Sequence, residues 1–166
     1  MPRGHVRSQG TVCDKWRTGL GCLPPSVESA RRPPQPSAPT VADIRTKRWN
    51  DPAEKGDGTR VLVCRYRPRG VRKEDEAWDD WLPQLGPSRE LHAAFYGKHG
   101  LPIGWVEYRR RYLAEMRAQT DAIESLAARV ARGETITLLC SSACVDPERC
   151  HRTLLKDLIE KAPRSS

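Results

Sequence analysis

The chain has 166 residues and a formal net charge of +8, and 37% of its residues are hydrophobic. This length predicts one ordinary domain with an appendage. No segment reaches the roughly 18–20 consecutive apolar residues of a membrane span, and the N-terminus lacks the apolar stretch of a signal peptide. We therefore expect a cytoplasmic protein, with no membrane partner, whose six cysteines are reduced thiols.

Residues 1–40 differ in composition from the remainder of the chain. They hold half of the fourteen prolines and end in the Pro/Ser-rich stretch RRPPQPSAPT, without sustained hydrophobic periodicity. Such a composition favours a disordered Pro/Arg-rich leader, and a functional basic arm is the alternative. We leave this segment out of the fold prediction.

The first half of the expected domain contains two strands and one helix start. ADIRTKRW (42–49) and RVLVCRY (60–66) have the apolar and β-branched character of strands. EAWDDWLPQLGPS (76–88) is typical of a short helix or turn. Ser88 then fits the N-cap of a following helix, with Leu91 and Phe95 on one side of it.

The second half alternates helices with one strand. Helical spacing predicts two helices around 105–117 and 120–132, with Gly133 as the stop of the second, and a last helix around 154–159. TITLLC (135–140) is nearly all apolar, which indicates a central strand buried on both faces. The interleaved order predicts that residues 41–163 form a small layered α/β domain, with a mostly parallel central sheet flanked by helices.

The segment LLCSSACVDPERCHR (138–152) concentrates three cysteines, a histidine and two arginines. The cysteine spacings do not match the tight knuckles of structural zinc sites, so we predict no metal ion, and we predict no cofactor. Position 146, six residues after Cys140, is aspartate, which argues against a phosphatase-like cradle. Asp146 and Pro147 fit the start of a helix, whose N-terminus would attract anions.

Two residues of this segment are candidate reacting groups. Cys140 would lie near the helix start and near Arg149 and Arg152, so we expect a lowered thiol pKa and assign Cys140 as the nucleophile. His151 would carry the proton. The alternative for Cys140 is a small, buried and inert core residue.

A second basic cluster follows the strand at 60–66. Arg65, Arg67 and Arg69 alternate, so an extended chain would present all three on one side, and an anion clamp is one interpretation. Pairing with the acidic residues at 74–80 is the other. Because ligands bind at the carboxyl ends of parallel strands, we expect this cluster and the segment 140–152 to line one concavity.

Five motifs in order resemble one known family. They are R-x-R-P-R-G at 65–70, L-x-P-S-x-x-L at 85–91, W-x-x-Y-x-x-x-Y at 105–112, T-L-L at 137–139 and C-H-R at 150–152. This set resembles the bacterial and archaeal family catalogued as domain of unknown function 488, in its C-H-R-containing branch, over residues 43–162. The resemblance implies a compact α/β domain and leaves the reaction open.

The combined prediction is a pocket for an anionic, phosphate-bearing small molecule or nucleotide, with a thiol-dependent reaction as its chemistry. Arg65, Arg67, Arg69, Arg149 and Arg152 are the predicted ligand-binding cations, and Ser88 is predicted to add a hydroxyl. A non-catalytic module that associates with nucleic acid is the alternative, supported by the net charge and the arginines at 109–117.

Overall fold

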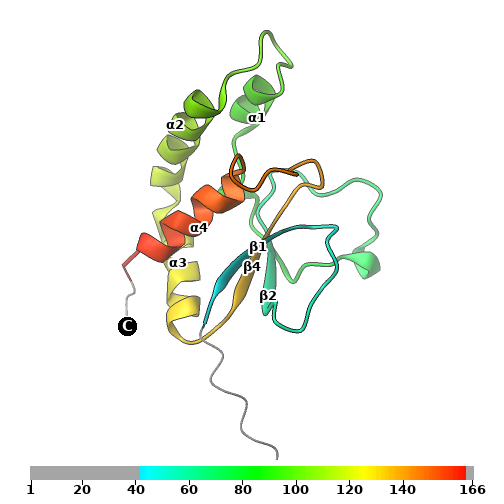
Figure 1. Ribbon diagram of the computed structural model, residues 1–166, viewed down its shortest axis with the longest axis vertical. Helices are drawn as coiled ribbons and strands as arrows, with labels where there is room; N and C mark the ends of the chain where they lie inside the picture. The colour runs from blue at the N-terminus through cyan, green and yellow to red at the C-terminus, as the bar shows by residue number, and fades with distance from the viewer. Residues whose placement is uncertain (1–41, 164–166) are drawn as a thin grey trace, which may run out of the picture. The chain divides into compact units, whose positions relative to one another are not determined.

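Four parallel strands form the central sheet, in the order β1-β4-β2-β3. They are β1 (Ile44–Arg48), β2 (Thr59–Leu62), β3 (Asp80–Trp81) and β4 (Ile136–Cys140). The structure is a computed structural model that describes residues 42–163 (Figure 1). The α/β prediction is confirmed, and every strand pair is parallel where a mostly parallel sheet was expected. The predicted leader at 1–40 lies outside the described residues.

The central position predicted for TITLLC is also confirmed. All five residues of β4 are buried, and the strand pairs with β1 on one side and β2 on the other. In the register, Arg48 lies opposite Cys140, and Leu62 lies opposite Leu139. The carboxyl ends of these three strands therefore meet at one edge of the sheet. In parallel sheets this edge is where ligands bind.

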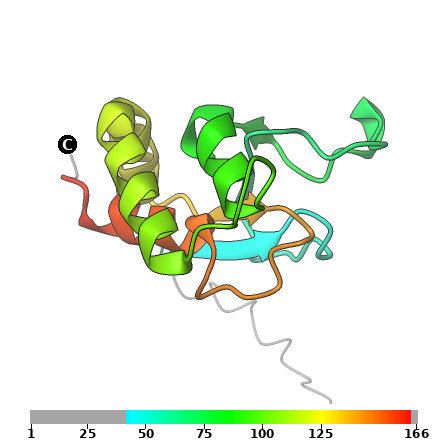
Figure 2. The same ribbon diagram turned by 90° about the horizontal axis from the view of Figure 1, so that it is seen from above.

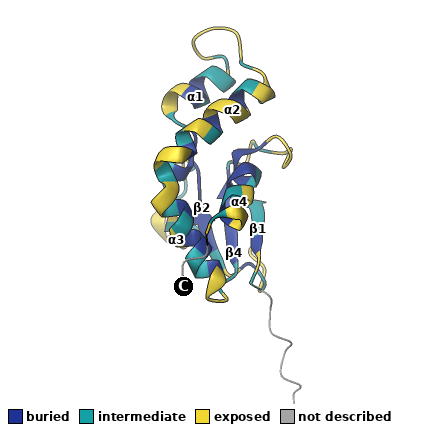
Figure 3. Cartoon of the chain, turned by 90° about the vertical axis from the view of Figure 1, so that its left-hand side faces the viewer, coloured by how far each residue is buried: buried dark blue, intermediate teal, exposed yellow. Residues whose placement is uncertain are grey.

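Four α-helices belong to the described residues, namely α1 (Arg89–Phe95), α2 (Trp105–Met116), α3 (Thr120–Ala131) and α4 (His151–Lys161). Figures 1 and 3 show α2, α3 and α4 along the same side of the sheet, with dark buried residues facing the strands. The apolar faces predicted for these helices are buried, including Tyr108, Tyr112, Leu126 and Leu155. None of the described helices is long and apolar enough to cross a bilayer.

A second, smaller core cluster lies at the carboxyl edge of the sheet. It consists of buried side chains that follow or end the strands and precede α4: Leu62, Cys64, Trp78, Leu139, Cys140 and Cys150. The half-buried side chains packed against this cluster, Trp49, Val71 and Cys144, come from loops. Figure 2 shows the segment between β2 and β3, with its short 3-10 turn at Lys73–Asp75, extending away from α2 and α4.

Residues 76–88, predicted as a short helix or turn, contain the turn and in addition a strand that was not predicted. This segment forms the two-residue edge strand β3 and a 3-10 turn at Pro83–Leu85. Backbone pairing with β2 explains the difference, because Asp79 N donates to Arg60 O at 2.8 Å and Leu82 N donates to Leu62 O at 2.9 Å. Long-range pairing of this kind overrides local propensity.

Candidate functional site

A cavity of about 320 Å³ opens at the carboxyl edge of the sheet. Residues 64–69, which follow β2, form one part of its lining. The segment from Cys140 to His151 contributes another part, and α1 and α2 contribute aromatic side chains. The two segments that the sequence placed at neighbouring strand ends therefore meet in one concavity, as expected.

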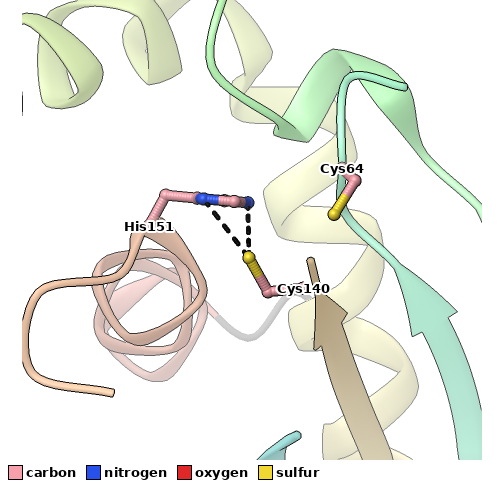
Figure 4. Close-up of side chains that lie close together, drawn as sticks. All are labelled: Cys64, Cys140 and His151. Carbon is pink, nitrogen blue, oxygen red and sulfur yellow. Dashed lines mark hydrogen bonds between the residues drawn. The ribbon is translucent and has the colours of Figure 1, made fainter. Parts of the chain in front are cut away.

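Sulfur atoms form the floor of this cavity. Cys140 Sγ lies 3.2 Å from Cys144 Sγ and 3.3 Å from Cys150 Sγ. Cys64 also lines the cavity, and its sulfur lies within 4.8 Å of Cys140 Sγ and of the nearest ring nitrogen of His151. Figure 4 shows Cys64, Cys140 and His151 converging from the end of β2, the end of β4 and the start of α4. All four of these cysteines are free thiols.

The structure contradicts the lowered pKa that the sequence suggested for Cys140. Hydrogen bonds with Cys144, Cys150 and Cys64, together with burial, raise the pKa of the Cys140 thiol well above its ordinary value. The thiol with a lowered pKa is that of Cys144 instead. Hydrogen bonds from Cys140 and Cys150 lower the pKa of the Cys144 thiol, and Cys144 is only partly buried.

The helix start predicted at Asp146 is also wrong. Asp146 Oδ1 accepts from the backbone N–H of Glu148 at 2.9 Å, which closes a local turn. Cys150 is extended, with φ −133° and ψ 140°, and α4 begins at His151. Arg149 therefore lies in a loop, and the positive end of the helix dipole is at His151, beside the sulfur cluster.

His151 is buried and held by the backbone. Its Nε2 lies 2.9 Å from Val63 O, so Nε2 carries the proton and donates it to this carbonyl. Burial lowers the pKa of His151, which favours the neutral imidazole. Cys140 Sγ lies 3.7 Å from Nδ1 and 3.8 Å from Nε2. The sulfur therefore packs against the ring face, and Figure 4 shows the ring edge-on with the sulfur beneath it.

Aromatic side chains form a wall that sequence reasoning missed. His92, Phe95 and Tyr96 come from α1 and its end, and Tyr66 lies opposite them with its ring centroid 5.6 Å from that of His92. The signal was present, since His92 and Tyr96 are four residues apart and share one side of the helix. A wall of this type suits a planar apolar group.

The five predicted arginines have different environments. Arg65, Arg67, Arg69 and Arg149 line the cavity, and Arg152 does not. Arg65 donates to the carbonyls of Pro87 and Gly86, and Arg67 pairs with Glu76, so these two are partly committed to the fold. Arg69 is exposed and forms no salt bridge within residues 42–163. The exposed Arg149 has only a 3.8 Å contact with Asp146.

Arg152 lies on the first turn of α4 and is 5% exposed. Its Nε and Nη1 atoms have no hydrogen-bond partner within the described part of the chain. A buried guanidinium with unsatisfied donors is costly unless a negative charge lies nearby. Two acidic groups meet this need. The positive charge of Arg152 contributes to the lowered pKa values of the Cys144 thiol and the Asp51 carboxyl group.

Ser88 has a structural role and does not line the cavity. Its Oγ accepts from Leu91 N at 3.0 Å, which confirms the predicted N-cap of α1. We expect Ser88→Ala to lower the free energy of unfolding by about 1 kcal/mol, the usual value of a cap. Chemical denaturation measures this loss. Ligand affinity should stay unchanged, and a large fall in affinity would show that the hydroxyl also reaches the ligand.

Comparison with known proteins gives the family of this fold. The family model described as the active DUF488-N3 subclade matches residues 44–163. The Escherichia coli (strain K12) protein YeaO, described as uncharacterised, is 42% identical over 100 residues, which are 60% of this chain and 84% of YeaO. The uncharacterised Mycobacterium tuberculosis (strain H37Rv) protein Rv3073c is 34% identical over 73 residues, 44% of this chain and 59% of that protein. No solved structure matches. The chain belongs to the DUF488 family, and its match lies in the DUF488-N3 subclade.

Proposed function

We propose that the cavity at the carboxyl edge of the sheet binds a phosphate-bearing small molecule or nucleotide in the cytoplasm, and that Cys140 and His151 act on it. The observation that carries this proposal is the pair of exposed arginines, Arg69 and Arg149, on two separate loops that line the same cavity. Guanidinium groups bind phosphate through charge-assisted hydrogen bonds. The start of α4 adds the positive end of its dipole.

The wall and the floor suit the other parts of such a ligand. A planar base or ring would pack against His92, Phe95 and Tyr96, with its phosphate directed to the arginines. The reacting group would then face Cys140. For reaction, the Cys140 side chain must rotate until its S–H points at Nδ1 of His151. The imidazole would accept the thiol proton there, because the Nε2 proton is committed to Val63 O.

Calorimetric titration with AMP tests the binding step, with adenosine as the ligand that lacks phosphate. We expect AMP to bind and adenosine to bind much more weakly. Arg69→Ala and Arg149→Ala should each weaken AMP binding about tenfold, because a hydrogen bond to a charged group contributes about 1.5–3 kcal/mol. Cys140→Ser should leave AMP affinity unchanged.

Arg117→Ala is the matched control, since Arg117 is an exposed arginine at the end of α2 outside the cavity. Its AMP affinity should equal that of the unsubstituted protein. Equal binding of AMP and adenosine, or equal losses in the Arg117 and Arg69 variants, would contradict the proposal.

The alternative, a nucleic-acid-binding module, has weaker support. Arg110 and Arg111 on α2 both pair with Glu107, so part of the positive charge of this helix is neutralised. Tyr108 and Tyr112 are buried and offer no stacking platform. Binding of a single-stranded oligonucleotide that falls steeply with salt and survives Arg69→Ala would favour this alternative.

A further inference from the structure

We infer that Cys140, Cys144 and Cys150 form a binding site for a thiophilic divalent cation of the zinc class. The three sulfurs lie within 4.8 Å of one another, and Cys140 Sγ contacts both of the others at 3.2 and 3.3 Å. This inference goes beyond the proposed function, because none of the phosphate-binding arginines belongs to the sulfur site.

The geometry is close to that of a bound ion. Zinc–sulfur bonds of about 2.3 Å in a tetrahedral site place neighbouring sulfurs about 3.8 Å apart. The observed contacts are shorter, so side-chain rotations that separate the sulfurs by about half an ångström would admit the ion. Cys144 is partly exposed, and all three residues line the cavity. An ion can therefore reach the three sulfurs from the cavity.

The fold of the loop brings the three cysteines together although their sequence spacing does not predict a metal site. The C-x3-C-x5-C spacing does not form the tight knuckle of a zinc finger. In the fold, Cys144 N donates to Ser141 O at 3.1 Å, which turns the chain back towards Cys140. The extended residue Cys150 returns beside Cys140 before α4 begins. The three ligands thus come from the end of β4 and the loop that follows it, and the adjacent His151 is not needed.

The charge of the surrounding residues also supports a divalent metal ion at this site. Three thiolates and a divalent cation carry a net charge of −1. Arg152, two residues after Cys150, is 5% exposed, and its Nε and Nη1 atoms lack hydrogen-bond partners among the described residues. A buried guanidinium of this kind would be compensated by an anionic metal–thiolate centre.

A second trio, Cys64, Cys140 and His151, shares Cys140 and also brings its ligand atoms within 4.8 Å. This trio is buried throughout, with Cys64 at 9%, Cys140 at 0% and His151 at 6% exposure. Its imidazole presents a ring face, rather than the Nδ1 lone pair, to the Cys140 sulfur, as the near-equal distances of 3.7 and 3.8 Å require. The three-cysteine trio is therefore the better site.

A metal ion at this site would hold the Cys140 sulfur as a thiolate ligand. A Cys140 sulfur bound in this way would be unable to act on the cavity ligand.

Cobalt titration of the reduced full-length chain tests the site. We expect one Co²⁺ per chain, with thiolate charge-transfer absorption in the near ultraviolet and the visible bands of a tetrahedral ion, both removed by added Zn²⁺. Cys144→Ser and Cys150→Ser should weaken Co²⁺ binding at least a hundredfold. The Cys64→Ser variant and the double variant Cys13→Ser/Cys22→Ser should retain Co²⁺ binding.

A second measurement avoids any variant that fails to fold. Zn²⁺ should protect Cys140, Cys144 and Cys150 of the unsubstituted protein, but not Cys64, from alkylation followed by mass spectrometry. Lack of cobalt absorption and of protection would overturn the inference. So would loss of binding in Cys64→Ser with retention in Cys144→Ser. The phosphate proposal fails separately, because Arg69→Ala should lose AMP and keep Co²⁺, whereas Cys144→Ser should lose Co²⁺ and keep AMP.

Discussion

Replacement of Asp57 by alanine should lower the free energy of unfolding by about 3–5 kcal/mol at pH 7, the usual cost of breaking a buried ion pair. The Asp57 side chain is 2% exposed. Its Oδ1 lies 2.6 Å from Lys47 Nζ, and its Oδ2 lies 2.5 Å from Arg60 Nη1. Alanine would leave the buried Arg60 without its carboxylate partner, and Lys47 would keep only the exposed Glu54 carboxylate at 3.3 Å. Urea denaturation with a two-state fit measures the loss.

The loss of stability caused by Asp57→Ala should depend on pH. Burial raises the pKa of Asp57, but hydrogen bonds from Lys47, from Glu54 N–H and from Arg60 outweigh it, so its pKa lies below the ordinary value. A lowered folded-state pKa contributes stability above the unfolded pKa of about 3.9, and this stability is lost as the pH falls through the folded value. The difference between the two proteins should therefore be constant near neutrality and shrink below about pH 4.

Asp43→Ala is the matched control for Asp57. Asp43 pairs with Arg45 at 3.5 Å, but the two side chains are 52% and 38% exposed. Exposed pairs contribute about 0–1 kcal/mol, so this variant should be almost as stable as the unsubstituted protein. If both variants lose a similar free energy of unfolding, burial of the Asp57 ion pairs is not the reason for their contribution to stability.

Tyr112→Ala should destabilise the domain by about 3–5 kcal/mol, as expected when a fully buried aromatic ring is removed. Tyr112 is 0% exposed, and its ring is stacked parallel to that of Tyr108 with centroids 6.2 Å apart. Its hydroxyl donates to Leu85 O at 2.8 Å. The ring centroid also lies 5.7 Å from that of the His151 imidazole, so removal of the ring should loosen the packing of His151 and lower the affinity for AMP as well.

The Tyr112→Phe variant distinguishes the stability contribution of the ring from that of the hydroxyl group. This variant keeps the packing and leaves only Leu85 O without its donor, which should cost about 1–3 kcal/mol. Denaturant unfolding of both variants measures the two parts. If the phenylalanine variant loses as much stability as the alanine variant, the hydrogen bond, rather than the packing, is the dominant contribution.

Much of the fold was predictable because local patterns and tertiary packing agree. TITLLC has no polar face, so only a central strand could bury it, and the structure places β4 between β1 and β2. The helical stripes at 105–116 and 120–131 were equally direct, since their apolar positions repeat with the helical period. The edge strand β3 was not predictable, because two residues carry no period and depend on a partner strand far along the chain.

The site was predictable only in outline. Strand ends placed Arg69 and Cys140 in one region, since parallel strands share a carboxyl edge. The start of α4 was missed, because Asp146 and Pro147 resemble a cap in sequence while the loop needs four more residues to reach the sheet. The contact between Cys140 and Cys144 depends on a turn at 141–144, and spacing alone does not determine its direction.

The position of β4 has a consequence for how the domain is made. Among the strands of residues 42–163, the central strand β4 is the last to be synthesised, and β1 and β2 each pair with β4 rather than with each other. While the chain emerges from the ribosome, β1 and β2 therefore cannot be joined into one sheet until residues 136–140 have been synthesised, because β4 lies between them. High contact order of this kind slows folding, and it leaves strand edges exposed to association in the interval. The nascent chain should therefore depend on chaperones until residues 136–140 have emerged, and a chain truncated before Ile136 should be unfolded and prone to aggregation.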